Sequence, residues 1–240
     1  MAQEAWSVPV REALHFLGWR GGPVEPQLED RLRALCKQVG RELEPRTIMR
    51  TFDIGKDGVF AGTRFCPEGG DVRAMLEPCF QGVLLAATLG AQSERMLLRA
   101  QARNAADALL LDAVLSAAIE AVCDAQEAAL RRSLGAQGLY LTDRFSPGYG
   151  DMPLAQSAEI LAVLDASRRI GLTLTASGLM LPRKSVTAVM GISRERVARR
   201  PAGCEACSAR KTCALRRGRA LENGEEDAGK GIESQEGGNG

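Results

Sequence analysis

Apolar residues in the first part of the chain recur at the spacing of amphipathic helices. One short pattern covers residues 8–17 and ends at Gly18. A second begins near Pro26, a residue type that is favoured in the first turn of a helix. The pattern therefore predicts two helices, of which the second is the longer. The apolar side chains of this second helix follow one another at intervals of three or four and share one face: Leu28, Leu32, Leu35, Val39 and Leu43.

Beyond this region the apolar pattern changes to that of β-strands. Residues 47–54 and 59–65 flank the turn-rich tetrad 55–58, which predicts a hairpin. Residues 83–89 form a continuous apolar run between two glycines, which is typical of a buried strand. Three further strands are expected, and the last two would pair with the first: 139–145, 170–175 and 185–192.

Helical patterns fill most of the sequence between these strands, over 71–80, 93–103, 105–134 and 154–167. The longest is rich in alanine, and polar residues interrupt it at Asp112, Ser116, Glu120 and Asp124. Because alanine lets neighbouring elements approach closely, we expect this helix to lie across the sheet as the central packing element. Strands and helices do not alternate as βαβ units. The predicted fold class is therefore α+β, with a mostly antiparallel sheet packed against long helices.

Length and charge narrow the class of protein. A chain of 240 residues with 45% hydrophobic and 25% charged residues is expected to form a single core with a tail. Its formal net charge of +1 gives no support to binding of nucleic acid or of a membrane surface. The first residues lack the basic and apolar regions of a signal peptide, and no apolar run approaches membrane-spanning length. The expected location is the cytoplasm.

The composition changes after residue 193, so the folded domain is expected to cover 1–193. Residues 194–219 contain nine Lys or Arg and two Glu, whereas 220–240 contain six acidic residues and one lysine. The first segment is a basic, cysteine-containing extension. The second has almost no apolar side chains to bury, so it is expected to be a disordered acidic tail.

The densest chemistry lies in residues 144–154. This stretch combines the guanidinium of Arg144, the phenol of Tyr149 and the carboxylate of Asp151 with two prolines and two glycines. Prolines restrict the backbone, and glycines let it approach a ligand closely. Because a predicted strand precedes it and a predicted helix follows it, the stretch is expected to form a rigid polar loop that suits a small zwitterion. The alternative is an ordinary proline-glycine turn with Arg144 in a salt bridge.

The motifs between residues 139 and 192 are similar in type and order to those of a known family. They begin with Arg-x-x-x-Gly-Tyr at Arg144, continue with Ile-Gly-Leu-Thr-Leu-Thr at 170–175 and end with Met-x-Pro-x-x-Ser-Val at 180–186. This run resembles the reactivation domain of cobalamin-dependent methionine synthase. Its Arg-Phe-Ser-Pro-Gly-Tyr-Gly-Asp form most resembles the free-standing, single-domain members, while the upstream half of the chain agrees only loosely. The family's α+β architecture is the same as the one predicted above.

The resemblance implies that the loop binds S-adenosylmethionine. In the family, this cofactor re-methylates cobalamin that has slipped to the inactive Co(II) state, with an electron from a flavodoxin-like donor. Carried over to this chain, Arg144 would grip the α-carboxylate, while Ser146, Gly148 and Tyr149 match the remaining motif positions. Asp151 would hold the ammonium group or cap the next helix. Catalysis would consist of placing the methyl group, with no catalytic acid or base.

Signatures of other cofactor sites are missing from the sequence. It has no Gly-x-Gly-x-x-Gly of Rossmann-type methyltransferases, no Cys-x3-Cys-x2-Cys of radical enzymes and no Asp-x-His-x-x-Gly that supplies a histidine to cobalt. The resemblance therefore implies that a partner carries the cobalamin, either a cobalamin-binding methionine synthase or a related corrinoid protein. A flavodoxin- or ferredoxin-type protein would supply the electron. One departure is Ala176, where the family commonly has an acidic residue.

A cluster of cysteines in the basic extension is a candidate metal site. Cys204, Cys207 and Cys213 have a spacing that can place three thiolates around an iron-sulfur cluster or a zinc ion, with free thiols as the alternative. The cluster and the arginines around it would form a docking face for an acidic electron donor. His15, the only histidine, is either an ordinary helix residue or a catalytic group or ligand. The remaining cysteines are expected to be buried thiols: Cys36, Cys66, Cys79 and Cys123.

Three functions follow from these patterns. The leading one is a stand-alone reactivation subunit, the methyltransferase component that supports reductive methylation of cob(II)alamin in a methionine synthase. The second is a non-catalytic S-adenosylmethionine-binding adaptor or regulator, or an activator of another corrinoid methyltransferase. The third is a small metal-cluster redox protein whose cofactor loop is vestigial.

Overall fold

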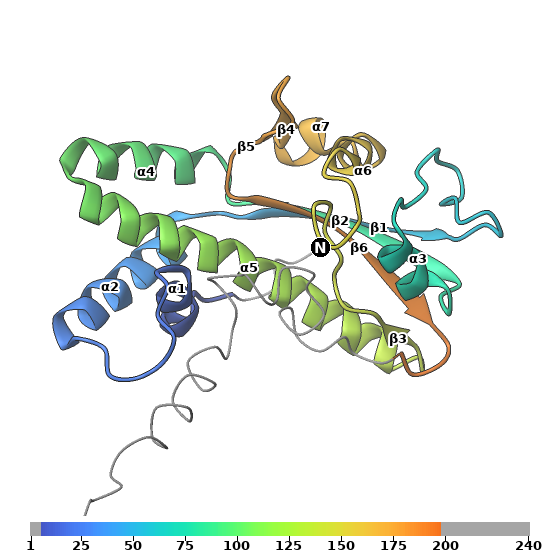
Figure 1. Ribbon diagram of the computed structural model, residues 1–240, viewed down its shortest axis with the longest axis horizontal. Helices are drawn as coiled ribbons and strands as arrows, with labels where there is room; N and C mark the ends of the chain where they lie inside the picture. The colour runs from blue at the N-terminus through green and yellow to red at the C-terminus, as the bar shows by residue number, and fades with distance from the viewer. Residues whose placement is uncertain (1–5, 198–240) are drawn as a thin grey trace, which may run out of the picture.

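The computed structural model describes residues 6–197 (Figure 1). The predicted metal site at Cys204, Cys207 and Cys213, most of the basic extension and the predicted acidic tail lie outside the described residues. The helices are α1 (Val10–Phe16), α2 (Pro26–Glu42), α3 (Gly70–Leu76), α4 (Ala91–Arg103), α5 (Ala105–Gly135), α6 (Gln156–Leu164) and α7 (Ala166–Ile170). The strands are β1 (Arg46–Asp53), β2 (Gln81–Thr88), β3 (Tyr140–Leu141), β4 (Thr173–Leu174), β5 (Met180–Leu181) and β6 (Ser185–Ser193).

Within residues 6–197, four strands form an antiparallel sheet in the order β1-β2-β6-β3. β2 lies inside this sheet, as its apolar sequence predicts. It pairs along its whole length with β1 on one side and with β6 on the other. β4 and β5 form a separate two-stranded hairpin. The predicted α+β class with an antiparallel sheet is confirmed.

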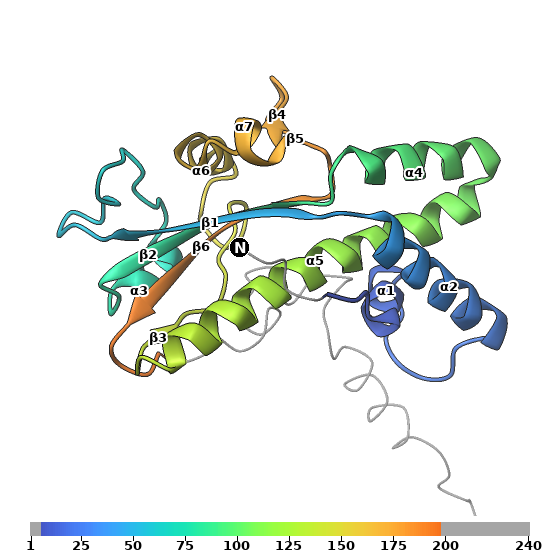
Figure 2. The same cartoon turned by 180° about the vertical axis from the view of Figure 1, so that it is seen from behind.

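Helices cover both faces of the sheet, which explains why β2 is apolar on both. Val83 and Leu85 belong to a core shared with α1, α2, α4 and α5. Leu84 and Ala86, which alternate with them, belong to a second core shared with α3, α6 and α7. Figures 1 and 2 show the resulting layers, with α5 along one face of the sheet and α6 and α7 on the other.

α5 is the central packing element that its composition predicts. It packs against α1, α2 and α4 and also contacts β2, β3 and β6. Ala117 and Ala118 within it are completely buried, where a larger side chain would hold the neighbouring elements apart. The helix stops where expected: Gly138 adopts a φ of 70°, and the Leu139 N–H then donates to the carbonyl of Leu134 at 3.0 Å.

The hairpin predicted over 47–65 is confirmed at its turn, where the chain reverses over 55–58, but its second strand is wrong. β1 pairs with β2 instead, and residues 59–65 form a loop that meets the end of β1 through one bridge between Ile54 and Phe60. The Phe60 N–H donates to the Phe65 carbonyl at 2.9 Å, so this loop folds back on itself. Both phenylalanine rings are buried in the second core. The apolar residues that suggested a strand therefore fill the core from a loop.

Two further elements differ from the prediction. Within residues 170–175 only β4 is a strand, and it pairs with β5 instead of with residues 139–145. The strand predicted over 139–145 is shorter than expected and consists of β3 alone. Residues 170 and 171 do not start a strand, because Ile170 is the last residue of α7 and Gly171 caps this helix with a φ of 69°. The helix predicted over 154–167 is interrupted at Asp165, whose φ of 52° separates α6 from α7.

The four cysteines in the described part of the chain are free thiols, as predicted, but the prediction that all four are buried is right for only two of them. Cys36 and Cys123 are buried, and Cys66 and Cys79 are partly buried. Among the helices of residues 6–197, none combines the length and the apolar character needed to cross a bilayer.

The buried thiols predict an alkaline loss of stability. Burial raises the pKa of the Cys36 thiol from 9.0 to about 11. Between pH 9.0 and about 11, the Cys36 thiol stays protonated in the native chain but loses its proton in the unfolded chain. The free energy of unfolding should therefore fall as the pH rises through this interval, by on the order of 1 kcal/mol. Urea denaturation in reducing buffer at about pH 8 and about pH 10 measures the change, and Cys36→Ala should show a smaller decline. Equal declines in both proteins would contradict the assignment.

Candidate functional site

The loop 144–154 is anchored at both ends in the core beneath α6. Phe145 exchanges two backbone hydrogen bonds with Val189 of β6, at 2.9 and 2.8 Å. The side chains of Phe145 and Met152 are both buried in the second core. The loop is therefore held by regular structure on both sides, as its sequence predicts.

Two glycines shape the exposed part of this loop. Gly148 and Gly150 have φ angles of 89° and 52°, which L side chains rarely adopt. A Cβ on Gly150 would lie 2.5 Å from a carboxylate oxygen of Asp71, so the space there also requires glycine. The Tyr149 N–H donates to the Ser146 carbonyl at 3.0 Å, which closes a tight turn. The turn presents the Tyr149 side chain at the surface, 56% exposed.

Asp151 has a structural partner that the sequence did not reveal. Its two carboxylate oxygens accept hydrogen bonds from the backbone N–H groups of Gly70, at 2.6 Å, and Asp71, at 3.2 Å. These groups open α3, so Asp151 caps a helix that lies earlier in the chain. The prediction that it caps the next helix is wrong, because α6 has no side-chain cap. Its other predicted role, holding a ligand ammonium, stays a prediction.

Arg144 faces a group of acids on α5. Its Nη2 lies 2.6 Å from Asp124 and 3.2 Å from Glu120, and its Nε lies 3.3 Å from Glu127. The side chain is only 16% exposed. The alternative interpretation of this loop, an ordinary proline-glycine turn, also predicted that Arg144 forms a salt bridge. The guanidinium is not saturated, however, because its Nη1 is buried without a hydrogen-bond partner among residues 6–197.

The charges around Arg144 keep its guanidinium group protonated. Burial is the largest influence and by itself would lower the pKa of Arg144. The Cys123 sulfur, which carries charge only as the thiolate at high pH, and the three carboxylates act in the opposite direction and hold the pKa of Arg144 above its ordinary value. Cys123 itself stays protonated, because its own burial raises its pKa to about 12.

The acids of α5 form a stripe that sequence reasoning did not assign to the site. Asp112, Glu120, Asp124 and Glu127, here called the α5 acidic stripe, bind basic groups from the segments next to the sheet. At one end, Lys184 lies 2.8 Å from Asp112. The signal was present, because the polar interruptions of this helix recur every four residues and therefore share a face. No local pattern in the sequence could indicate that these acids would contact Arg144 and Lys184.

Arg131 of α5 binds the residues that directly precede the loop. Its Nη2 pairs with Glu127 at 2.7 Å and with Asp143 at 2.9 Å, and it also donates to the Thr142 carbonyl at 2.8 Å. Because Glu127 also contacts Arg144, the two arginines share one carboxylate. The backbone that delivers Arg144 is therefore tied directly to α5.

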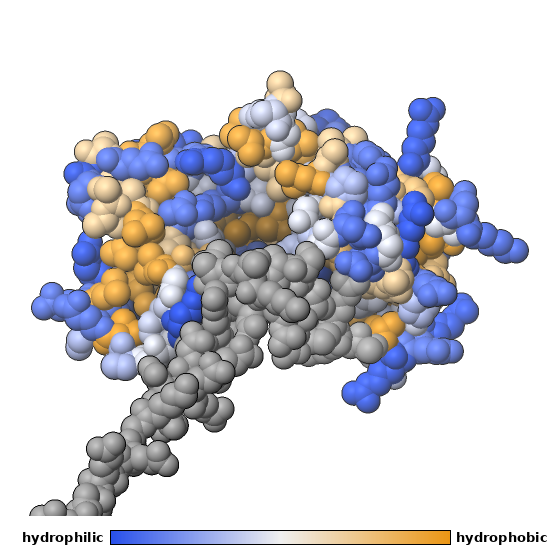
Figure 3. All heavy atoms as spheres, viewed as in Figure 1, coloured by the Kyte–Doolittle hydropathy of each residue, from blue (hydrophilic) through white to orange (hydrophobic). Residues whose placement is uncertain are grey.

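The site opens to solvent on its acidic side. Glu120 and Asp124 have side chains that are 46% and 69% exposed. Figure 3 shows a hollow in the visible surface between α4 and the loop that leads to α6. The arrangement is a shielded guanidinium beneath exposed carboxylates, which suits a ligand that carries both signs of charge.

Two other sequence-based candidates, Ala176 and His15, belong to other elements of the fold. Ala176 lies in the exposed turn between β4 and β5. His15 lies in α1, where its ring meets Phe16 edge-on at 6.1 Å. Across residues 6–197, no group of three or more His, Cys, Asp or Glu side chains is arranged to hold a metal ion.

Comparison with known proteins shows the fold. No protein-family model matches the chain, and no curated protein matches it in sequence. Among solved structures, the chain is similar to a crystal structure of the MetH reactivation domain bound to AdoHcy. The TM-score is 0.55 with 16% sequence identity, over 81% of this chain and 78% of that one. The predicted reactivation-domain fold is thereby confirmed.

The capping role of Asp151 can be tested by removing its carboxylate. Asp151→Ala leaves two N–H groups of α3 without their acceptor, so the free energy of unfolding should fall by about 1 kcal/mol in urea denaturation. Asp30→Ala, which changes an exposed acid of α2, is the control and should stay within about 0.5 kcal/mol of the unchanged chain. The cap assignment does not survive if the two variants are equally stable.

Proposed function

We propose that the chain binds S-adenosylmethionine between the loop 144–154 and the α5 acidic stripe. The observation that carries the proposal is the buried Nη1 of Arg144, which has no hydrogen-bond partner within residues 6–197 and belongs to a side chain that contacts the exposed carboxylates of Glu120 and Asp124. A buried donor without a partner costs about 1–3 kcal/mol, which a ligand carboxylate that accepts its hydrogen bond would recover. The fold supports the proposal, since a similar domain was solved with AdoHcy bound.

The charges of the ligand and of the site are complementary. S-adenosylmethionine carries an α-carboxylate, an α-ammonium and a sulfonium. Arg144 offers a guanidinium to the carboxylate, and Glu120 and Asp124 lie beside it for the two cationic groups. The three acids around Arg144 also hold it in one orientation before the ligand arrives, which lowers the entropic cost of binding.

We further propose that the chain is the reactivation component of a cobalamin-dependent methionine synthase. The bound cofactor would supply an electrophilic methyl group. The chain's own residues would hold it and exclude water, so that a partner's reduced cobalamin meets the methyl group in line. The cobalamin and the electron would come from other proteins, a corrinoid protein and a flavodoxin- or ferredoxin-type donor. The alternative functions, a regulator or an activator of another corrinoid methyltransferase, would use the same S-adenosylmethionine site.

Binding is tested by calorimetry on Arg144→Met. Loss of the guanidinium should weaken S-adenosylmethionine binding by on the order of 2 kcal/mol, or about 30-fold in Kd. Arg168→Met, which removes an exposed arginine of α7 that pairs with Asp165, is the matched control and should bind normally. Circular dichroism verifies that both variants are folded. An unchanged isotherm for Arg144→Met would refute the site.

The role of the acidic stripe is tested by Asp124→Asn. If Asp124 faces a cationic group of the ligand, the neutral side chain should weaken binding roughly two- to fivefold, because the pair is exposed and screened. If the acid instead only competes with the ligand carboxylate for Arg144, the same variant should bind more tightly. The sign of the change in Kd therefore decides between the two arrangements.

The reactivation role requires a functional assay. A methionine synthase that lacks its own reactivation domain is trapped as cob(II)alamin and mixed with reductant and S-adenosylmethionine. Adding the chain should produce the absorbance of methylcobalamin, and Arg144→Met should do so at least about tenfold more slowly. Tight cofactor binding without any re-methylation would instead favour the regulator.

A further inference from the structure

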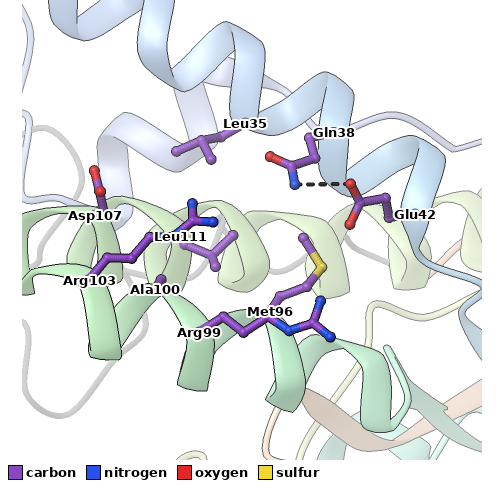
Figure 4. Close-up of a pocket in the computed structure, with 9 residues that line it drawn as sticks. All are labelled: Leu35, Gln38, Glu42, Met96, Arg99, Ala100, Arg103, Asp107 and Leu111. Atoms are coloured by element: carbon purple, nitrogen blue, oxygen red, sulfur yellow. Dashed lines mark hydrogen bonds between the residues drawn. The ribbon is translucent and has the colours of Figure 1, made fainter.

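A cavity lies at the far end of α5 from the loop 144–154. It occupies about 360 Å³ between α2, α4 and α5 (Figure 4). Its floor is apolar and comes from all three helices, with Met96 and Leu111 buried and Leu35 and Ala100 partly buried. On α5, Leu111 is separated from Asp124 by 13 positions, or about 20 Å along the helix axis. The cavity is therefore separate from the proposed cofactor site.

Two arginines of α4 stand at the mouth of this cavity. Arg99 and Arg103 are four positions apart, so they lie on the same side of the helix. Both residues are exposed, and neither guanidinium group makes a hydrogen bond or an ion pair within residues 6–197. Figure 4 shows both side chains extending along the α4 wall. Two unneutralised guanidinium groups here can chelate one anionic group, as a fork that matches carboxylate or phosphate oxygens.

The acids around the cavity do not neutralise this pair. Asp107 is engaged by Arg31 and by Asn104. Glu42, on the α2 wall, accepts a hydrogen bond from Gln38 at 2.9 Å (Figure 4). The two walls therefore differ in charge: on α4, Arg99 and Arg103 have no ionic partner among the described residues, and on α2 the cavity is lined by the carboxylate of Glu42. An anionic group would be directed to the α4 side.

We propose that this cavity binds a small amphipathic anion, with its hydrocarbon body on the floor formed by Met96 and Leu111 and its carboxylate or phosphate between Arg99 and Arg103. The volume lies in the range of small-molecule sites, about 300–1,000 Å³. Apolar area removed from water provides the affinity, and the arginine pair provides the selectivity for charge. This site goes beyond the proposed function and does not depend on it. A bound ligand would also brace α2 against α4.

The test is calorimetry of the full chain with octyl phosphate, below its micellar concentration. One equivalent should bind. Arg99→Gln with Arg103→Gln should weaken binding at least about tenfold. Arg33→Gln, which removes an exposed arginine of α2 that already pairs with Glu29, should not. Glu42→Gln should strengthen binding, because it removes the opposing charge from the facing wall.

Matched ligands and a second type of variant separate the two halves of the site. Inorganic phosphate lacks the hydrocarbon and octyl glucoside lacks the charge, so each should bind at least about tenfold more weakly than octyl phosphate. Ala100→Phe fills the floor without changing any charge and should also abolish binding. Binding of octanoate as well as octyl phosphate supports the proposal and ranks the two anionic groups.

Three results would overturn the proposal: full binding by the double arginine variant, equal binding of octyl glucoside, or equal binding of inorganic phosphate. Because Arg99 and Arg103 are exposed and unpaired within residues 6–197, their variants are expected to stay folded. The test therefore stands even if Ala100→Phe fails to fold.

Discussion

The candidate site depends on the ion cluster that joins Arg144 to Glu120, Asp124 and Glu127 of α5. A guanidinium that is 16% exposed would be costly without these carboxylates, because burial alone disfavours its charge. With them it stays ionised and oriented, while Nη1 has no hydrogen-bond partner in the part of the chain that the structure describes. The cluster thus does two things at once: it attaches the loop to the longest helix, and it keeps a binding group ready.

The fold brings the partners of this cluster together through the sheet. β6 receives Phe145 through two backbone hydrogen bonds, and Arg131 of α5 holds the carbonyl of Thr142. The loop is therefore positioned from both sides, by a strand and by a helix. α5 also packs against β2 and β6, so the helix that carries the acids rests on the same sheet that holds the loop. Such rigid support is what a site that works by positioning requires.

α5 also connects the two proposed sites. Its N-terminal part lines the cavity with α2 and α4, and its C-terminal part carries the acids that face Arg144. The two sites differ in chemistry. One places exposed acids around a shielded cation, and the other places free cations over an apolar floor. A single chain can therefore present opposite charges to different ligands although its formal net charge is only +1.

Local patterns in the sequence determined several of the elements and the turn within the loop 144–154. Helical spacing located α2, the apolar run located β2, and the glycines at 148 and 150 marked the turn, because each depends on neighbouring residues and their backbone preferences. Only the tertiary structure decided which groups meet. Asp151 caps α3 across 81 positions, and Lys184 reaches Ser116 across 68. Periodicity shows that a residue is polar or apolar, but a contact between distant residues depends on how the whole chain packs.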